Sequence, residues 1–292
     1  MIHRKSEGIA LIQALLVTML IAVMALSLSY GARERVAVAG AFQDRLQAEL
    51  LWRTTQTQVL EGFFRHDLTR LSGMQLYGAR WNFWGQPFVL ESGAQVTIQA
   101  VTGLVSLNGG SDDLLQSVLT GAGASNAQAE TVIKSLADWV DSDDVQRFNG
   151  AEASLYQQYN FKKPRNGAIQ DVSEFRVING MNDELFTQIK DLLTIYPTYE
   201  VNPLYAPRAV INHIIAADVV DEVLRRRQSG LSESDWRQLL GQKQAVSVSL
   251  YPGNTFEVSI QVTLGDVILR KGFVLELQKN NPSHPMLVLS KY

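Results

Sequence analysis

Four aspartates lie within seven residues of this chain, and a glutamate follows shortly after them. The stretch LADWVDSDDVQRFNGAE contains Asp138, Asp141, Asp143, Asp144 and Glu152. Asp138 and Asp141 would share one face of a helix near its C-terminal end, where the helix dipole disfavours anions. A hard cation such as Ca²⁺, which takes roughly six to eight oxygen ligands, would compensate this charge. A solvated acidic turn, offset by Arg147, is the other interpretation.

The spacing matches an EF-hand calcium loop only in part. With Asp141 at the first position, Asp143, Asn149 and Glu152 stand where that loop places ligands. Gln146, however, stands where the loop needs glycine for its sharp turn. The sequence therefore predicts oxygen ligation without an EF-hand.

Other metal and catalytic chemistry has no motif in the sequence. The chain of 292 residues has no cysteine, which excludes disulfides, thiolate zinc sites and cysteine nucleophiles. Its four histidines lie far apart, and no HExxH, GxSxG, Walker or dinucleotide fingerprint occurs. We therefore do not expect an enzyme, although an anchored periplasmic enzyme remains an alternative because distant residues can converge in space.

Charge gives little support for nucleic-acid binding. The formal net charge is -3 and no long basic block occurs. The Asn179-Gly180 turn lies between two predicted helices, as in helix-hairpin-helix DNA-binding modules, but glycine stands on one side only. The short run Arg225 to Arg227 follows acidic residues, which favours a solvated helix end. We expect no nucleic-acid partner and keep an anchored DNA receptor as an alternative.

The N-terminal segment is long and apolar enough to span a membrane. From Gly8 to Ala32 there is no charged residue, and about 22 residues of helix cover the roughly 30 Å hydrocarbon layer. His3, Arg4 and Lys5 precede the run, so the N-terminus is expected in the cytoplasm and the rest across the inner membrane, in the periplasm. The run is too long for a conventional cleaved signal, whereas a plain anchor remains possible.

The helix should continue well beyond the membrane. No proline occurs before Pro87, and apolar residues recur at helical spacing at Val36, Ala39, Phe42, Leu46 and Leu50. We predict one helix over residues 9–64, with its first half in lipid and its second half available to pack on a soluble domain.

The remaining pattern predicts an α+β fold. Alternation at Val96, Ile98 and Ala100 indicates a strand, which residues 104–107 would extend. Helical patterns and breaking prolines follow, and strand patterns return at 246–250, 256–264, 267–277 and 286–289, with Gly265-Asp266 at a hairpin turn. We predict an antiparallel sheet from residues 65–108 and 241–292, packed on the N-terminal helix, with an all-α domain inserted at 109–240.

A charged leader ending in glycine, followed by an uncharged segment and an amphipathic continuation, resembles the class III signal of type IV pilins and pseudopilins. The resemblance implies a leader of residues 1–8, cleavage by prepilin peptidase after Gly8, and methylation of Ile9. Gln13 occupies the fifth mature position, where most members carry glutamate. An ionised carboxylate in the bilayer is costly unless it is paired. In lacking this glutamate, the chain resembles the pseudopilin K family of type II secretion. Members of that family lie at the filament tip, without a neighbouring subunit above them.

The inserted helical domain also resembles the pseudopilin K family, and DWVDSD is similar to that family's Asp-Trp-x-Asp-x-Asp stretch. The resemblance implies structural calcium, with ligands among Asp138, Asp141, Asp143, Asp144 and Glu152. It also implies minor pseudopilins I and J and other pseudopilins as partners, and a role in starting assembly of the pseudopilus and limiting its growth. A minor pilin of a type IV pilus or competence system is the alternative within this class.

Overall fold

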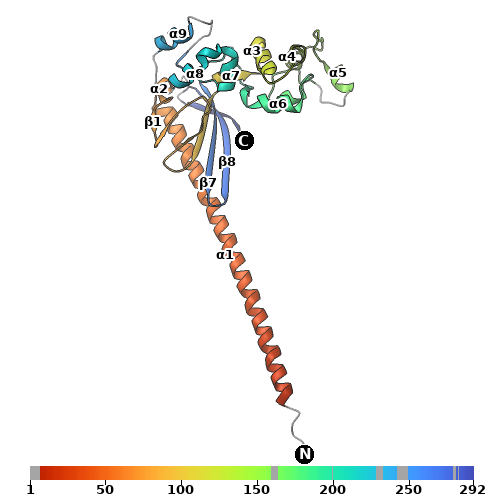
Figure 1. Ribbon diagram of the computed structural model, residues 1–292, viewed down its shortest axis with the longest axis vertical. Coiled ribbons are helices and arrows are strands. Elements are labelled where there is room, and N and C mark those ends of the chain that lie inside the picture. The colour runs from red at the N-terminus through yellow and green to blue at the C-terminus, as the bar shows by residue number, and fades with distance from the viewer. Residues whose placement is uncertain are drawn as a thin grey trace, which may run out of the picture.

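The computed structural model describes residues 7–158, 164–198, 200–227, 233–241, 249–278, 281 and 283–292. A single long helix, α1 (Glu7–Arg65), carries an antiparallel sheet along its C-terminal half. Most of the remaining helices lie near the C-terminal end of α1 and to one side of it (Figure 1). The α+β architecture predicted from the sequence, with a pilin-like helix and sheet and an inserted helical region, is confirmed.

One face of α1 meets the sheet, and it is not the face that the sequence spacing marked. The buried side chains recur every three to four residues, as one stripe of a helix must. Phe42, Leu46 and Leu50 from the expected stripe are 70%, 50% and 57% exposed. The C-terminal half of α1, which follows the apolar span, therefore carries two apolar stripes. The rest of this chain covers only one of them. The buried stripe is formed by Ala48, Trp52, Thr55, Val59 and Phe63.

Gly62 allows the helix to come close to the sheet region. A Cβ atom at this position would lie 2.6 Å from the indole ring of Trp81, a distance that side chains do not tolerate. Trp81 is fully buried and its indole nitrogen donates to the Leu76 carbonyl oxygen, so it has little room to shift. The contact fixes how the end of α1 sits on the chain that follows it.

Five strands form the main sheet, in the order β3-β4-β7-β8-β9. All its pairings are antiparallel. Buried residues alternate along β7, because one face of the sheet lies against α1 and the other is partly open to water. The strands are β3 (Phe88–Val89), β4 (Gln95–Ala100), β7 (Thr255–Leu264), β8 (Val267–Leu277) and β9 (Met286–Lys291).

The hairpin between β7 and β8 turns over two residues, as predicted. Leu264 pairs with Val267, and Gly265 between them has a φ of 54°, a conformation that suits glycine and that the turns of tight hairpins require. This turn sets the register of ten residue pairs between the two longest strands.

A long insertion separates two neighbouring strands. Ala100 at the end of β4 pairs with Phe256 in β7, although more than 150 residues of sequence lie between them. The insertion contains most of the helices: α3 (Asp112–Gly121), α4 (Asn126–Val140), α5 (Ala153–Gln158), α6 (Asp183–Ile189), α7 (Arg208–Ile214), α8 (Ala217–Arg226) and α9 (Glu233–Gly241). It also has 3-10 turns at Val101–Gly103, Val172–Val177 and Lys190–Leu192, and β5 (Val105–Ser106) pairs in parallel with β6 (Leu193–Thr194).

The expected extension of the first strand through residues 104–107 is wrong. The 3-10 turn at Val101–Gly103 ends β4, and β5 then leaves the main sheet to pair inside the insertion. Gly103 packs against the backbone of Tyr205, which bends the chain away. The expected strand at 246–250 falls largely outside the described residues, and residues 249 and 250 are not in a strand.

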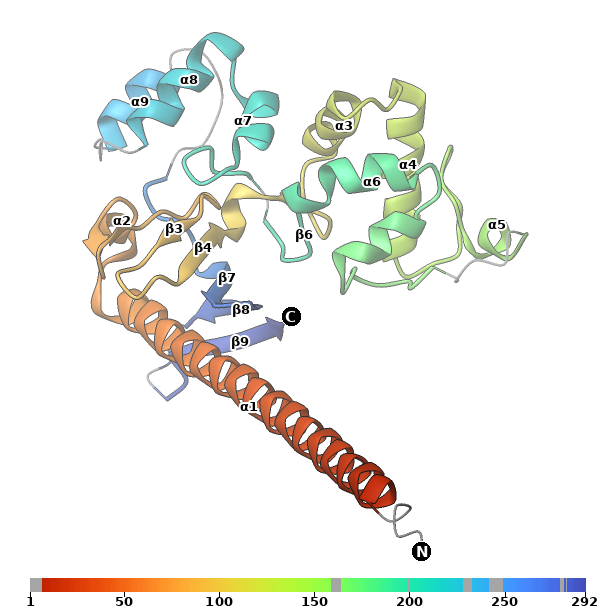
Figure 2. The same cartoon turned by 60° about the horizontal axis from the view of Figure 1, so that its bottom comes forward.

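Two groups of helices share the insertion. Figure 2 shows α8 and α9 near α2 (Leu68–Leu71) and the start of the sheet, while α3, α4, α5 and α6 project to one side. Between α2 and β3, the short strands β1 (Gln75–Leu76) and β2 (Ala79–Arg80) form their own hairpin.

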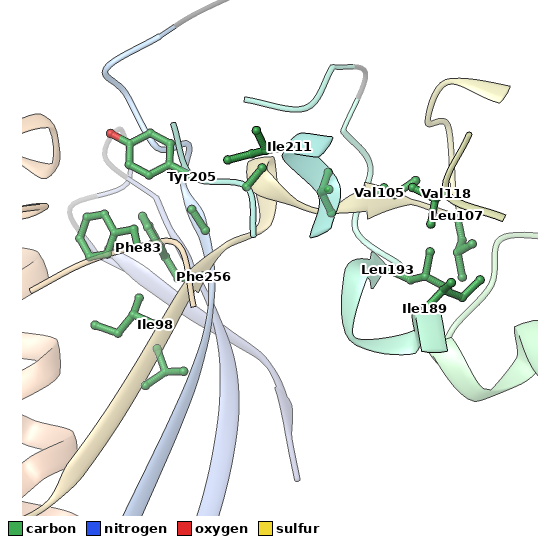
Figure 3. Packing of buried hydrophobic residues seen from close by; sticks show 14 of the residues in the cluster. Phe83, Ile98, Val105, Leu107, Val118, Ile189, Leu193, Tyr205, Ile211 and Phe256 are labelled. Carbon is green, nitrogen blue, oxygen red and sulfur yellow. The ribbon is translucent and has the colours of Figure 1, made fainter. Parts of the chain in front are cut away.

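The buried core is continuous from the sheet into the insertion. In Figure 3, Phe83, Ile98 and Phe256 represent the sheet side, and Ile189 and Leu193 represent the helical side. Ile211 lies between the two groups, and Tyr205 of the insertion lies beside Phe83 on the sheet side, with 6.4 Å between the ring centres. The phenol hydroxyl of Tyr205 donates to the Leu250 carbonyl oxygen. The insertion is therefore packed onto the sheet rather than tethered by its two connections alone.

Candidate functional site

Three of the predicted acidic side chains come together at the end of α4. Oxygen atoms of Asp138, Asp141 and Glu152 lie within 4.8 Å of one another. Asp138 is in the last turn of α4, Asp141 caps its C-terminus, and Glu152 stands just before α5. The chain between them folds back so that residues eleven positions apart or more share one site.

Local sequence explains how α4 and the following loop bring these groups together. Ser125 caps the start of the helix by accepting the Gln128 amide, as its capping-box spacing predicts. At the other end, Gly150 lies so close to Asp138 that a Cβ atom would be 2.0 Å from the carboxylate. The Gln146 side-chain amide donates to the Gly150 carbonyl oxygen at 2.7 Å and closes the loop. Only glycine fits at position 150.

Arg147 partly neutralises the site. Its guanidinium contacts both Asp138, at 2.8 Å, and Asp141, and its backbone amide also donates to Asp138. These two carboxylates raise the pKa of Arg147 well above its usual range. Arg147 is therefore a partner of the cluster, as the alternative interpretation of the sequence proposed, but one guanidinium faces three carboxylates.

Arg147 forms ion pairs with Asp138 and Asp141 but not with Glu152. Glu152 is 2% exposed, and neither of its carboxylate oxygens has a hydrogen-bond partner, nor does Oδ1 of Asp141. Burial, followed by the charges of Asp138 and Asp141, raises the pKa of Glu152. Buried carboxylates without partners are costly unless they are protonated or bind a cation. The donor set, which is all oxygen, fits a hard divalent cation such as Ca²⁺.

Asp143 and Asp144 lie in the same loop but outside this group. Asp143 accepts the Val145 amide at 2.8 Å, and Asp144 accepts the side-chain amide of Asn166 at 3.2 Å. Both are exposed, so water can solvate them. The structure thus brings together three of the five predicted ligands and uses the other two to shape the loop.

The Asn179-Gly180 turn, which resembles a phosphate-binding turn in sequence, packs against α4. The Asn179 amide donates to the phenol oxygen of Tyr156, and the Gly180 carbonyl accepts the side-chain amide of Gln128. Tyr156 in turn contacts the indole of Trp139 edge to face at 5.3 Å. The Asn179 amide is therefore engaged inside the protein, where it supports the helix that carries Asp138.

One contact between chemically active side chains has no signal in the sequence. Ser117 on α3 lies 3.0 Å from Nδ1 of His213 on α7, although the two are far apart in the chain. Burial lowers the pKa of His213. Among the described residues, no ion pair or hydrogen bond joins His213 to a carboxylate that would orient it, and Gly121 packs against its ring. The pair serves the packing of α3 on α7.

The predicted processing residues lie at the start of α1. Gly8 and Ile9 belong to its first turn, and Gln13 is exposed on the following one, whereas residues 1–6 lie outside the described part. The apolar stretch has a mean hydropathy of 2.7 over its most apolar 18 residues, none of them buried by the rest of the chain. This segment is a candidate membrane anchor by length and composition.

Three comparisons bear on what this arrangement is. Residues 101–198, which contain the acidic cluster, match the family model of the type II secretion system (T2SS), protein K. A putative type II secretion system protein K of Escherichia coli is 26% identical over 272 residues, covering 80% of this chain and 79% of that protein. The type II secretion system protein K of Klebsiella pneumoniae is 27% identical over 203 residues, covering 64% of this chain and 62% of that one.

The fold is also similar to a solved structure. A chain in the crystal structure of the GspK-GspI-GspJ complex from the enterotoxigenic Escherichia coli type 2 secretion system aligns with a TM-score of 0.55 at 20% identity. The alignment covers 86% of this chain and 97% of that one. The sequence matches and the shared fold confirm the resemblance predicted above: residues 101–198 match the family model of type II secretion system protein K, and the chain is similar to proteins of that name over most of its length.

Proposed function

We propose that this protein is a minor pseudopilin that caps the tip of the type II secretion pseudopilus, where it starts assembly and limits growth. One observation carries the proposal. The inserted helical region lies at the end of α1 remote from the apolar span and extends sideways beyond the sheet (Figure 1). If subunits stack through their long helices, this region occupies the space that a subunit above would need.

The uncovered stripe on α1 supports packing with sister subunits. Phe42, Leu46 and Leu50 are spaced by four residues and are half exposed or more, with Val38 one further step toward the membrane. Exposed apolar residues in a contiguous row indicate an interaction surface. The helices of minor pseudopilins I and J are the partners we propose for it, because the similar fold was solved in a GspK-GspI-GspJ complex.

The proposed topology follows from the N-terminal segment. The positive residues before the apolar span would keep the N-terminus in the cytoplasm, with prepilin peptidase cutting after Gly8 and methylating Ile9. Gln13 carries no charge, so no neighbouring amine is needed to neutralise it in the bilayer. Mass spectrometry of the N-terminal peptide from inner membranes should find methylated Ile9. An intact leader would contradict the assignment to this class.

We further propose that Asp138, Asp141 and Glu152 hold a structural calcium ion. When bound, the ion would satisfy the unpartnered oxygens of Glu152 and Asp141. Its role would be structural, to fix the loop after α4.

Thermal unfolding of the full chain in maltoside micelles tests the calcium site. A calcium titration should raise Tm in a saturable way, and Glu152→Gln together with Asp141→Asn should abolish the rise. Asp266→Asn in the β7–β8 turn, remote from the cluster, is the matched control and should respond like the unchanged chain. Equal responses of all three proteins would show that no ion binds at this cluster.

The fold allows the capping role to be tested by removing the insertion. Because Ala100 and Phe256 are paired neighbours, a short turn can join β4 to β7 in place of residues 101–254. Cells that overproduce the major pseudopilin with this variant should form longer pseudopili than cells with the full chain, as measured by electron microscopy. The variant must still co-purify with pseudopilins I and J. Pseudopili of unchanged length despite that co-purification would contradict a steric cap.

A further inference from the structure

A buried arginine without hydrogen-bond partners lies at the C-terminal end of α8. Arg227 is 7% exposed, and none of its three guanidinium nitrogens has a hydrogen-bond partner. Its guanidinium carbon lies 5.2 Å from the ring centroid of Trp84, on the loop before β3. Two parts of the chain that are distant in sequence thus meet at this side chain.

The cation–π contact does not satisfy this side chain. The Trp84 ring accepts no hydrogen bond from Arg227, so the N–H donors of the guanidinium remain without partners. Burial lowers the pKa of Arg227 to about 10, so the group keeps its charge at neutral pH. Buried charges in proteins are ordinarily paired, and an unpaired one is costly. The guanidinium of Arg227 therefore lacks the acceptor that a buried charge normally has.

Arg227 forms part of the wall of a cavity of about 550 Å³. Two further arginines, Arg70 and Arg80, line the same cavity, and no aspartate or glutamate does so among the described residues. The aromatic rings of Trp84, Trp236 and Tyr205 form much of the rest. The cavity therefore places the buried charge of Arg227 beside aromatic rings, where the lower local dielectric strengthens its attraction for an anion.

We infer that this cavity, which we call the Arg227 pocket, binds an oxyanion, a carboxylate or phosphate group, through the guanidinium of Arg227 with Arg70 and Arg80 at its rim. The planar fork of a guanidinium matches two oxygens of such a group. This inference does not depend on the proposed role in secretion.

A membrane lipid is excluded as the source of the anion by position. Thr69 and Arg70 of the pocket lie on α2, directly after the end of α1 at Arg65. The uncharged span ends at Ala32, so about 33 residues of helix, roughly 50 Å, separate the pocket from the bilayer. The anion must come from solution or from an acidic segment of a protein.

Isothermal titration calorimetry of the full chain in maltoside micelles tests the inference. The probes are inorganic phosphate, succinate and a triglutamate peptide, at low ionic strength in a buffer without oxyanions. At least one probe should bind saturably. Arg227→Gln should weaken that binding between roughly tenfold and hundredfold, since it removes hydrogen bonds from a charged donor. The affinity of Arg227→Lys should lie between that of the unchanged chain and that of Arg227→Gln, because lysine keeps the charge but lacks the planar fork of donors.

Matched variants separate an anion site from a structural arginine. Arg208→Gln removes an exposed arginine on α7 that pairs with Asp221, and it should leave binding unchanged. Arg70→Gln, at an exposed position on the rim, should weaken binding even if Arg227→Gln fails to fold.

Either of two results would overturn the inference: the absence of saturable binding to all three probes, or equal affinity in the Arg227, Arg70 and Arg208 variants. Binding of the small anions alone would identify a free oxyanion as the ligand. Binding of the peptide would identify an acidic protein segment.

Discussion

The spine and sheet of this protein are held together differently from its helical region. Between α1 and the sheet, Phe63 lies against Phe83 and Phe256 at ring distances of 5.7 and 4.7 Å, and all three are buried. In the helical region, Asp138 is fully buried and Glu152 nearly so. The first contact is stabilised by apolar burial. The second depends on how charge is compensated.

The two kinds of contact should respond differently to the surrounding solution. Apolar packing responds little to ions or to pH near neutrality, which suits a contact that must hold the sheet on the long helix α1. A charge cluster can be set by a cation and leaves its loop sensitive to the surrounding solution. We therefore expect perturbations in the two regions to differ in their dependence on calcium, pH and salt.

The largest effect should come from the spine contact. Phe63→Ala should cost about 3–5 kcal/mol of unfolding free energy, because it removes a buried aromatic side chain and leaves a cavity. Chemical denaturation in micelles measures this, with and without calcium, and the loss should be the same in both. Phe64→Ala, at the neighbouring position that is 49% exposed, should cost less than about 1 kcal/mol. If the loss of unfolding free energy in Phe63→Ala depended on calcium, the contrast between the α1–sheet contact and the acidic cluster would not hold.

The next effect should be confined to the helical region. Asp138→Ala leaves the Arg147 backbone amide without its acceptor and should destabilise α4 by about 2–3 kcal/mol. Hydrogen exchange should report faster exchange in α4 but not in β7. Glu130→Ala, at an exposed position on the same helix, is the control and should change little. Equal loss of protection in β7 would show that the two regions unfold as one unit.

A smaller effect concerns Glu257, which faces the cavity between β7 and the insertion. Burial, despite the Thr194 hydroxyl nearby, raises the pKa of Glu257 from 4.5 to about 7. Asp191 adds to this rise, while Arg270 and Tyr292 line the same cavity. Between these two pH values the folded state binds more protons than the unfolded chain, so stability falls as pH rises, and the loss is complete above about 7.

Glu257→Gln removes this titration. The unchanged chain should lose about 2–3 kcal/mol of unfolding free energy between pH 4.5 and pH 7 through this group, whereas the variant should lose that much less. Parallel pH profiles of the two proteins would contradict the assignment. The result would show whether the stability of the contact between β7 and the insertion depends on pH, unlike that of the apolar contact between α1 and the sheet.

The smallest effect should come from the ion pair between α1 and β8. Lys271 lies 2.7 Å from both oxygens of Glu49, which lowers the pKa of Glu49, and it sits over the Trp52 ring. Lys271 is 39% exposed, so water screens the pair. A double-mutant cycle with Lys271→Met and Glu49→Gln should give a coupling of about 0.5–1 kcal/mol that shrinks in high salt. A double-mutant cycle between Glu49 and the exposed Arg53 of α1, which lies 3.7 Å from it, should give a smaller coupling energy.

Periodicity and local chemistry made much of the fold predictable. The uncharged run and the lack of proline before Pro87 predicted one long helix, and α1 is that helix. Alternation with a Gly265-Asp266 turn predicted the β7–β8 hairpin, and Ser125 predicted the start of α4. These signals are local, since each depends on neighbours within a few residues.

The packing face of α1 was not predictable in the same way. Two stripes of the helix are apolar, and sequence spacing singled out the one with Phe42 and Leu46, whereas the sheet covers the one with Ala48 and Val59. Both stripes carry apolar side chains, so spacing alone does not decide which one the sheet covers, and the choice depends on the shape of the partner. Gly62 against Trp81 is part of that shape.

What the sequence determined by itself is therefore the set of elements and the chemistry they carry: a membrane-length helix, an antiparallel sheet, and a cluster of carboxylates that needs compensation. Tertiary structure alone decided which groups meet. It folded Glu152 back onto Asp138 and excluded Asp143, and it brought Arg227 onto Trp84. The reason is physical: local preferences act over a few residues, whereas burial and charge pairing depend on which distant segments share a volume from which water is excluded.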